Sequence, residues 1–211
     1  MGAYLNGKIA TDRWLAELGS ASTSQARAET IQRILRRHAS SRERSETLSA
    51  FYEAIFAGLG EVTTVVDLAC GLNPLARPFM PLPPDCAYGV YDVHGGLVDF
   101  VLRALDLLGY PAFGSTWDLL NGPPEVEADV VLLLKTLPCL TQVDQAVGVR
   151  LLLAIKAPTI VVSYPVRSLG GGKRGMRGFY RDQFLGLARA LPRRIEELPI
   201  AEELVFRLRD A

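Results

Sequence analysis

The residues best suited to hold a ligand follow the first short apolar run of the sequence. This run leads into Asp67-Leu-Ala-Cys-Gly-Leu-Asn-Pro74, a turn with one glycine, Gly71. A glycine after a strand lets the backbone approach a ligand closely, because no Cβ intervenes. A dinucleotide site normally requires the spacing G-x-G-x-x-G, since it must also cradle a pyrophosphate. The single glycine therefore favours a ligand without phosphates, and S-adenosylmethionine is such a ligand.

Two acidic residues end later apolar runs and complete the same kind of site. Asp92 closes Gly89-Val-Tyr-Asp92, about 20 residues beyond the loop, where a carboxylate can accept hydrogen bonds from both hydroxyls of a ribose. Asp118 closes Ser115-Thr-Trp-Asp118 and is placed to accept from an adenine amino group. Either acid alone can equally be a helix N-cap. Together with the loop, they predict an S-adenosylmethionine site at the carboxyl ends of three successive strands.

The cysteines offer a competing chemistry. Cys139 follows the fourth apolar run, where cytosine-C5 methyltransferases carry a nucleophilic thiolate that attacks C6 of the base. Its apolar neighbours would raise the pKa of the thiol and so disfavour that role. With Cys70 and Cys86 there are three cysteines. An odd number without metal-like spacing argues against a disulfide framework and against a zinc site, so we expect no metal.

From residue 62 onward, short β-branched runs alternate with helical stretches. Apolar strands separated by helices indicate a parallel sheet that is covered on both faces. The end of the chain differs, because two strand-like runs joined near Pro199 predict an antiparallel hairpin. The expected fold is α/β, of the class I Rossmann-like methyltransferase type, with a mainly parallel seven-stranded sheet. The expected strands span residues 62–68, 86–91, 112–117, 129–134, 159–164, 194–198 and 203–208, and the clearest helices 96–108, 142–155 and 181–191.

The N-terminal third is expected to be helical. Residues 25–37 carry an apolar stripe at helical spacing. Ser40-Ser-Arg-Glu43 has the form of a capping box, which would start a second helix that runs to about Ala57. We therefore expect residues 1–57 to form a short helical segment and residues 58–211 to form the ligand-binding domain.

The charged residues balance overall but are unevenly distributed. With 23 basic and 23 acidic residues among 211, the composition alone does not favour a nucleic-acid partner. Residues 27–44, however, hold six arginines and two glutamates, and residues 167–181 hold five basic residues and no acid. These stretches are either solvated surfaces or parts of one basic face. No apolar run reaches the roughly 18 residues of a membrane span, and no signal-peptide core is evident, so we expect a cytoplasmic protein.

Four strings of residues together resemble one enzyme family. They are His38-Ala-Ser-Ser-Arg-Glu-Arg44, Val66-Asp-Leu-Ala-Cys-Gly-Leu-Asn-Pro74, Leu134-Lys-Thr-Leu-Pro138 and Val162-Ser-Tyr-Pro-Val-Arg-Ser-Leu-Gly-Gly171. In this order they are similar to the aminoglycoside-resistance 16S rRNA methyltransferases, which methylate N7 of guanine 1405. The resemblance runs from about Ile31 to the C-terminus. It implies an S-adenosylmethionine-dependent enzyme that acts on 16S rRNA within the small ribosomal subunit and confers aminoglycoside resistance.

The resemblance also implies roles for individual residues at the cofactor. Arg44 would pair with the methionine carboxylate, and Ala69 and Gly71 would line the loop. Asp92 would hold the ribose, and Asp118 would face the adenine.

Further residues are implied at the target. Lys135 would reach it from an open site, because a buried lysine is costly without a partner. Arg167 and Ser168 would engage the flipped guanine. The residues expected to contact RNA are Lys173, Arg174 and Met176 of the same loop, with Arg36 and Arg37 of the first basic stretch.

The expected reaction and two departures from the family's pattern bear on which function the chain has. Guanine N7 has no proton to remove, so the reaction needs alignment rather than an acid–base pair. The chain has fewer residues before His38 than the family, whose longer helical extension docks on the subunit, and Trp117 stands where a polar residue is common. The alternatives are a methyltransferase for another RNA or a small molecule, and a cofactor-binding homologue without activity. The basic, glycine-rich residues 167–176 favour RNA.

Overall fold

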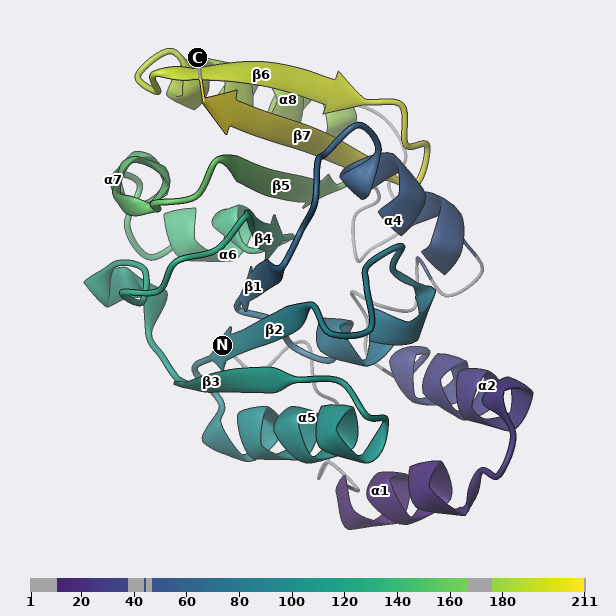
Figure 1. Ribbon diagram of the computed structural model, residues 1–211. Coiled ribbons are helices and arrows are strands. Elements are labelled where there is room, and N and C mark those ends of the chain that lie inside the picture. Colours follow the sequence, from purple (N-terminus) through teal and green to yellow (C-terminus); the bar gives the residue numbers. More distant parts are fainter. Residues whose placement is uncertain (1–10, 38–43, 45–46, 167–175, 211) are drawn as a thin grey trace.

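The protein is built around one mixed sheet, seen in a computed structural model that describes residues 11–37, 44, 47–166 and 176–210 (Figure 1). Within these residues the sheet has seven strands in the order β3-β2-β1-β4-β5-β7-β6. β7 is antiparallel to both neighbours, and the other pairs are parallel. The expected parallel sheet with a terminal antiparallel hairpin is thus confirmed. The strands are β1 Thr64–Leu68, β2 Ala87–Asp92, β3 Ala112–Thr116, β4 Val130–Leu134, β5 Thr159–Pro165, β6 Arg193–Leu198 and β7 Glu203–Asp210.

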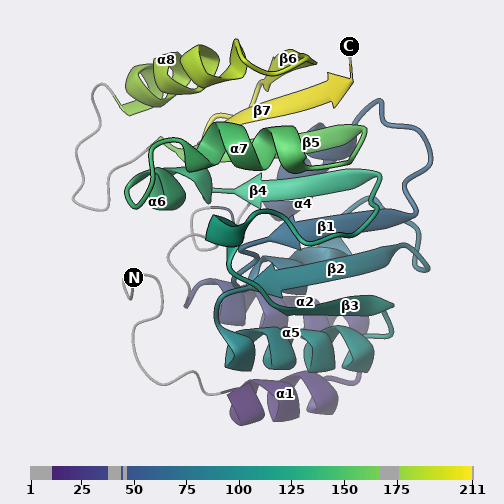
Figure 2. The ribbon, with the colours of Figure 1, turned by 90° about the vertical axis from the view of Figure 1, so that its left-hand side faces the viewer.

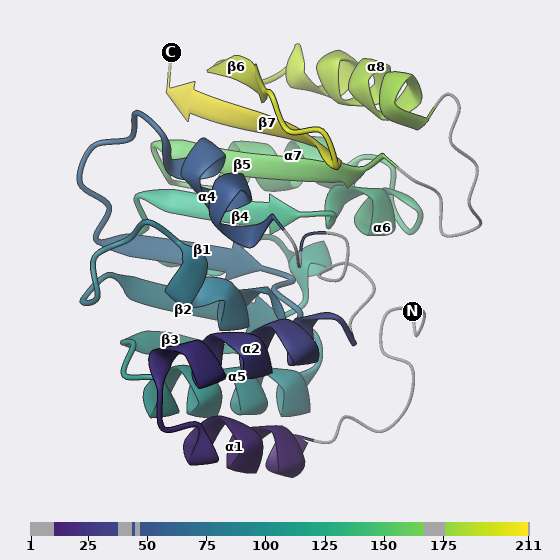
Figure 3. The same cartoon turned by 90° about the vertical axis from the view of Figure 1, so that its right-hand side faces the viewer.

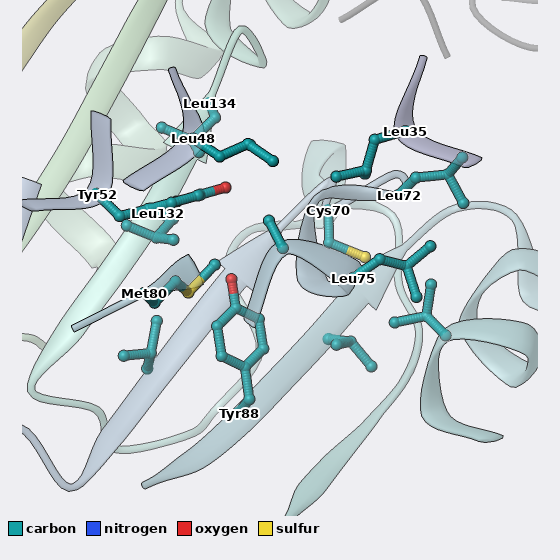
Figure 4. Close-up of a cluster of buried hydrophobic side chains, with 14 of the residues drawn as sticks. Leu35, Leu48, Tyr52, Cys70, Leu72, Leu75, Met80, Tyr88, Leu132 and Leu134 are labelled. Atoms are coloured by element: carbon teal, nitrogen blue, oxygen red, sulfur yellow. The ribbon is translucent and has the colours of Figure 1, made fainter. Parts of the chain in front are cut away.

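Helices cover both faces of the sheet. Figure 3 shows α2 and α4 in front of the strands, and Figure 2 shows α6 and α7 on the opposite face. Each face has its own hydrophobic cluster, and part of the first is drawn in Figure 4. The elements on the first face are α1 Thr11–Ser20, α2 Ser24–Leu35, α4 Leu48–Phe56, the 3-10 helix η1 Asn73–Phe79 and α5 Gly95–Leu107. Those on the second are α6 Leu137–Thr141, α7 Val147–Ala154 and α8 Met176–Ala188.

The strand pattern follows from this double cover. All five residues of β4 are buried, as expected for a central strand that faces helices on both sides. The parallel strands end at one edge of the sheet, and β7 begins there because Glu203 pairs with Pro165. In Figure 3 the arrowheads of β1 and β4 point to the same side, and that of β7 points the other way. Side chains from both halves of the chain therefore meet at this edge.

The N-terminal helices pack onto the same core as the sheet. α1 contacts α5, and α2 contacts η1. The hydroxyl of Thr23 accepts a hydrogen bond from the Ala26 amide and caps α2, and Glu17 of α1 pairs with Arg33 of α2 at 2.8 Å. The predicted division of the chain at residue 57 stays a prediction, and the proposed capping box at residues 40–43 lies outside the described residues.

Three predicted helices differ from the observed ones. The helix expected from Ser40 to about Ala57 corresponds to α4, which begins at Leu48. The helix expected over residues 142–155 begins only at Val147, because the Asp144 carboxylate accepts from the Ala146 amide and forms a turn. The last helix, expected from Arg181, begins at Met176, where a loop was predicted. Its first turns are held by Tyr180, whose ring lies 5.2 Å from that of Tyr164 on β5. No helix in the described part of the chain is long and apolar enough to cross a membrane.

Candidate functional site

The loop after β1 is tied to the end of β2. The Gly71 amide donates to Asp92 Oδ2 at 3.0 Å, and the Cys70 amide donates to the Tyr91 carbonyl at 3.1 Å. Ala69 has φ 54° and Gly71 has φ 53°, so the chain turns through two left-handed residues. For alanine this conformation costs roughly 1 kcal/mol, and such strain is typical of functional loops. The exposed Ala69 and half-buried Gly71 thus lie where the sequence placed the cofactor loop.

Asp92 is nearly buried at this edge, with 7% of its surface exposed. Its Oδ1 accepts from the His94 amide at 3.0 Å, and its Oδ2 accepts from Gly71. A carboxylate has about four acceptor positions, so these two bonds leave capacity for hydroxyl donors. The carboxylate is therefore fixed in orientation by the backbone and is still able to accept from a ribose, the role predicted for it.

Asn73 connects the loop to two other parts of the core. Its Nδ2 donates to Asp67 Oδ2 at 2.7 Å, and its Oδ1 accepts from Arg44 Nη1 at 2.9 Å and from the Tyr52 hydroxyl at 2.6 Å. Tyr88 donates its hydroxyl to Asp67 Oδ2 at 3.0 Å. Figure 4 shows Tyr52 and Tyr88 among the buried apolar side chains of the first cluster. Sequence reasoning assigned no role to Asn73, which anchors the tail of the loop.

Asp67 is a buried acid under the loop. Burial raises its pKa to about 7, although hydrogen bonds from Asn73 and Tyr88 and the nearby charge of Arg44 act in the opposite direction. Near neutral pH this carboxyl group therefore changes between its protonated and ionised forms.

A second buried carboxylate, Glu203 at the start of β7, joins the two cations predicted for the site. Arg44 donates from Nε to Oε1 and from Nη2 to Oε2, the latter at 3.1 Å, and Lys135 Nζ lies 3.2 Å from Oε1. The Arg44 guanidinium also lies 4.6 Å from the centre of the Phe51 ring. The exposed fractions of the Glu203, Arg44 and Lys135 side chains are 0%, 4% and 7%. Burial alone would raise the pKa of Glu203, but Arg44 and Lys135 outweigh it and lower that pKa.

Lys135 does not lie in an open site, and that prediction is wrong. Only 9% of the residue is exposed, and its backbone is left-handed with φ 58°. Its amide donates to the Ser163 carbonyl at 3.0 Å and to the Ser163 hydroxyl at 3.1 Å. Its partner is Glu203, which the sequence did not indicate because β7 lies far from Lys135 along the chain and reaches this edge only by pairing with β5. The proposed role of Lys135 at the target stays a prediction.

Asp118 and Trp117 lie at the end of β3. The exposed Asp118 accepts from the Leu120 amide at 3.0 Å and caps the 3-10 helix η2 Leu119–Asn121, which confirms the N-cap alternative. Its second oxygen is compatible with the predicted adenine contact, which stays a prediction. Trp117 donates its indole N–H to the Gly122 carbonyl at 2.9 Å and packs against the cluster on the α6–α8 face.

The residues expected to contact RNA are only partly described. Arg36 and Arg37 are exposed just after α2. Met176, expected in a loop, is the first residue of α8. The remaining predicted residues, Arg167, Ser168, Lys173 and Arg174, lie outside the described residues.

Cys139 occupies α6, just beyond the end of β4. Its Sγ lies 3.7 Å from the Lys135 carbonyl oxygen. Cys70 is buried under the loop, and burial raises the pKa of its thiol well above the usual value. In the part of the chain that the structure describes, no group of three or more His, Cys, Asp or Glu side chains is arranged to hold a metal ion.

The donor set at this edge fits S-adenosylmethionine. The Asp92 carboxylate can accept from ribose hydroxyls, and the turn at Ala69 and Gly71 lets a ligand approach the backbone closely. Arg44 is a cation next to the loop, to which it is joined by its hydrogen bond to Asn73. Asp92 and the loop thus suit two parts of such a ligand. The pairing of Arg44 with the methionine carboxylate stays a prediction, since the three nitrogens of Arg44 donate to Glu203 and Asn73.

Comparisons with known proteins agree with this assignment. A family model described as "Ribosomal RNA methyltransferase (FmrO)" matches residues 6–206. The chain is 38% identical to a 16S rRNA (guanine(1405)-N(7))-methyltransferase of Micromonospora echinospora, over 92% of this chain and 71% of that protein. It is 32% identical to an enzyme of the same description from Serratia marcescens, over 88% and 72%. The crystal structure of the 16S rRNA methyltransferase RmtF in complex with S-adenosyl-L-homocysteine matches with a TM-score of 0.79 and 30% identity, over 95% of this chain and 74% of that one.

Proposed function

Because the chain belongs to the FmrO family of ribosomal RNA methyltransferases, we propose that it methylates N7 of guanine 1405 in 16S rRNA. The methyl donor is S-adenosylmethionine, and the substrate is the rRNA within the small ribosomal subunit. The modification confers aminoglycoside resistance on the host. Since ribosomes work in the cytoplasm, the enzyme acts there.

The observation that carries this proposal is the fixed arrangement of Asp92 and the loop. Backbone amides on both sides of Asp92 orient its carboxylate, and one of those amides belongs to Gly71 of the loop. A relative with 30% identity has been crystallised with S-adenosyl-L-homocysteine. The loop, Asp92 and Arg44 are the residues we assign to the cofactor, with Ala69 beside them and Asp118 at the adenine.

The reaction is a matter of alignment. Bound S-adenosylmethionine supplies an electrophilic methyl group. Guanine N7 carries an in-plane lone pair and no proton, so the protein needs no general base. The protein must therefore hold guanine N7 in line with the methyl group of the cofactor and exclude water. The hydrogen bonds of Gly71, Asp92 and Asn73 support that alignment by fixing the cofactor loop.

We also propose which residues hold the target guanine. We place Lys135, Arg167 and Ser168 at the reacting guanine. A stacked base must leave its helix to reach such a site, and basic side chains can hold the displaced strand by its phosphates. For that contact we assign Lys173, Arg174 and Met176 together with the exposed Arg36 and Arg37.

The test is methylation of purified small subunits that lack this modification. The protein and labelled S-adenosylmethionine are added, and N7-methylguanine is located by chemical cleavage and primer extension. The expected product is a single modified position at guanine 1405, absent from subunits that carry adenine there. Transfer to free RNA only, or to another position, contradicts the substrate assignment. Cofactor binding without transfer to any RNA contradicts the enzymatic assignment.

A further inference from the structure

Two buried cations at the cofactor edge share one carboxylate, and that carboxylate is nowhere near them in sequence. Glu203 lies 159 positions after Arg44. Its Oε1 is contacted by both Arg44 Nε and Lys135 Nζ, and its Oε2 by Arg44 Nη2. We propose that Glu203 is a positioning residue that fixes Arg44 and Lys135 and sets the charge that the protein presents to the cofactor's sulfonium. This inference rests on the proposed function.

The geometry gives Glu203 its positioning role. A bidentate pair with a carboxylate holds a guanidinium in one plane, and the Phe51 ring, 4.6 Å away, supports that plane. The third nitrogen of Arg44 then donates to Asn73 of the cofactor loop. Lys135 is held from two directions, by Ser163 at its backbone and by Glu203 at its ammonium. Glu203 thus connects the hairpin to both the loop after β1 and the turn after β4.

The charge balance gives Glu203 its second role. Arg44 and Lys135 contribute two positive charges and Glu203 one negative charge, all with side chains at most 7% exposed. Charges buried to this degree are weakly screened by solvent and salt. Removing the Glu203 charge raises the net charge of the three residues by one. A cationic ligand is disfavoured by that change more than a neutral one of the same shape.

Substrate and product form such a matched pair of probes. S-adenosylmethionine carries a sulfonium, whereas S-adenosylhomocysteine carries a neutral thioether. Both share the adenosine, the carboxylate and the amino group. A merely structural loss at Glu203 weakens both ligands alike, so the ratio of the two dissociation constants isolates the effect of charge.

The experiment measures both dissociation constants by calorimetry for the full chain. In Glu203→Gln, affinity for S-adenosylmethionine is expected to fall about fivefold relative to that for S-adenosylhomocysteine. In Lys135→Met, which lowers the net charge by one, the ratio is expected to move the opposite way. In the double variant the ratio is expected to return near the wild-type value. The matched control is Glu197→Gln on the neighbouring β6, which removes the carboxylate facing Arg177 and Arg181 and should leave the ratio unchanged.

The outcomes separate this inference from the function on which it rests. Equal weakening of both ligands in Glu203→Gln overturns the inference and leaves the proposed function standing. A wild-type protein that binds neither ligand overturns both. If Glu203→Gln does not fold, Lys135→Met and the double variant differ only at Glu203 and should show the same fivefold difference in ratio; equal ratios in those two overturn the inference.

Discussion

The Gly71 amide donates to Asp92 Oδ2 at 3.0 Å, which joins the turn after β1 to the end of β2. Because His94 donates to the other oxygen, the Asp92 carboxylate cannot rotate without breaking a backbone bond. The Gly71 backbone and the Asp92 carboxylate, both predicted at the cofactor, are therefore held together as one rigid unit.

Asp92→Asn is expected to weaken S-adenosylmethionine binding by at least about tenfold, since an amide retains one acceptor oxygen where the carboxylate offers two. Calorimetry measures the dissociation constant directly. Asp99→Asn, on the exposed side of α5, is the matched control and should bind like the wild type. Unchanged affinity in Asp92→Asn contradicts the assignment of this edge to the ribose.

Asn73→Ala is expected to lower the free energy of unfolding by about 2 kcal/mol, because it leaves the buried hydroxyl of Tyr52 and one nitrogen of Arg44 without their acceptor. Cofactor affinity should fall as well, since the tail of the loop loses its bond to Asp67. Urea unfolding measures the first effect and calorimetry the second. Asn121→Ala at an exposed position is the control. Wild-type stability in Asn73→Ala would show that the bridge contributes nothing.

The raised pKa of Asp67 predicts how stability depends on pH. Burial places this pKa at about 7 in the folded protein, against 3.8 for an ordinary aspartate in water. Between about pH 4 and pH 7 the folded state therefore keeps a proton that the unfolded state has released, so this group lowers stability as the pH rises through that window.

Asp67→Asn removes that dependence. The free energy of unfolding of the variant minus that of the wild type is expected to increase from pH 5 to pH 8 and then to level off. Urea unfolding at unit intervals of pH gives this difference directly, and it cancels the effects of other titrating groups. A difference that is constant across the range would mean that Asp67 is ionised throughout.

Cys139→Ala is expected to retain methylation activity within about twofold, because transfer to N7 needs no covalent intermediate. The initial rate of methylation of small subunits measures it. Cys139→Ser is the companion variant, since it preserves a polar contact toward the Lys135 carbonyl. Complete loss of activity in both variants would favour a thiolate that attacks a pyrimidine.

The sequence predicted the features that depend on neighbouring residues. Short apolar runs that alternate with helical stretches located the seven strands to within a few residues. The last two runs, joined near Pro199, predicted the terminal hairpin. Ala69, Gly71 and Asp92 were predicted because each lies at the end of a strand or within three residues of it. These signals are local, and the carboxyl ends of parallel strands come together in any such sheet.

The features that escaped prediction depend on contacts between distant segments. Lys135 was expected in the open because no acid near it in sequence could pair with it, whereas Glu203 reaches it only once β7 lies beside β5. The role of Asn73 was missed for the same reason, since its partners are Tyr52 of α4, Asp67 of β1 and Arg44, which precedes α4. The signal that could have identified Glu203 is an acidic residue at the first position of the terminal antiparallel strand.

The position of Glu203 on the last strand has a consequence for synthesis on the ribosome. A growing chain acquires Arg44 first, then Lys135, and only 68 residues later Glu203, whose carboxylate balances them. Burying two unbalanced cations is strongly unfavourable, so the edge of the sheet cannot close around them until β7 has been made and has paired with β5. Partly synthesised chains consequently leave both cations in water, and the cofactor edge does not form until β7 has been made.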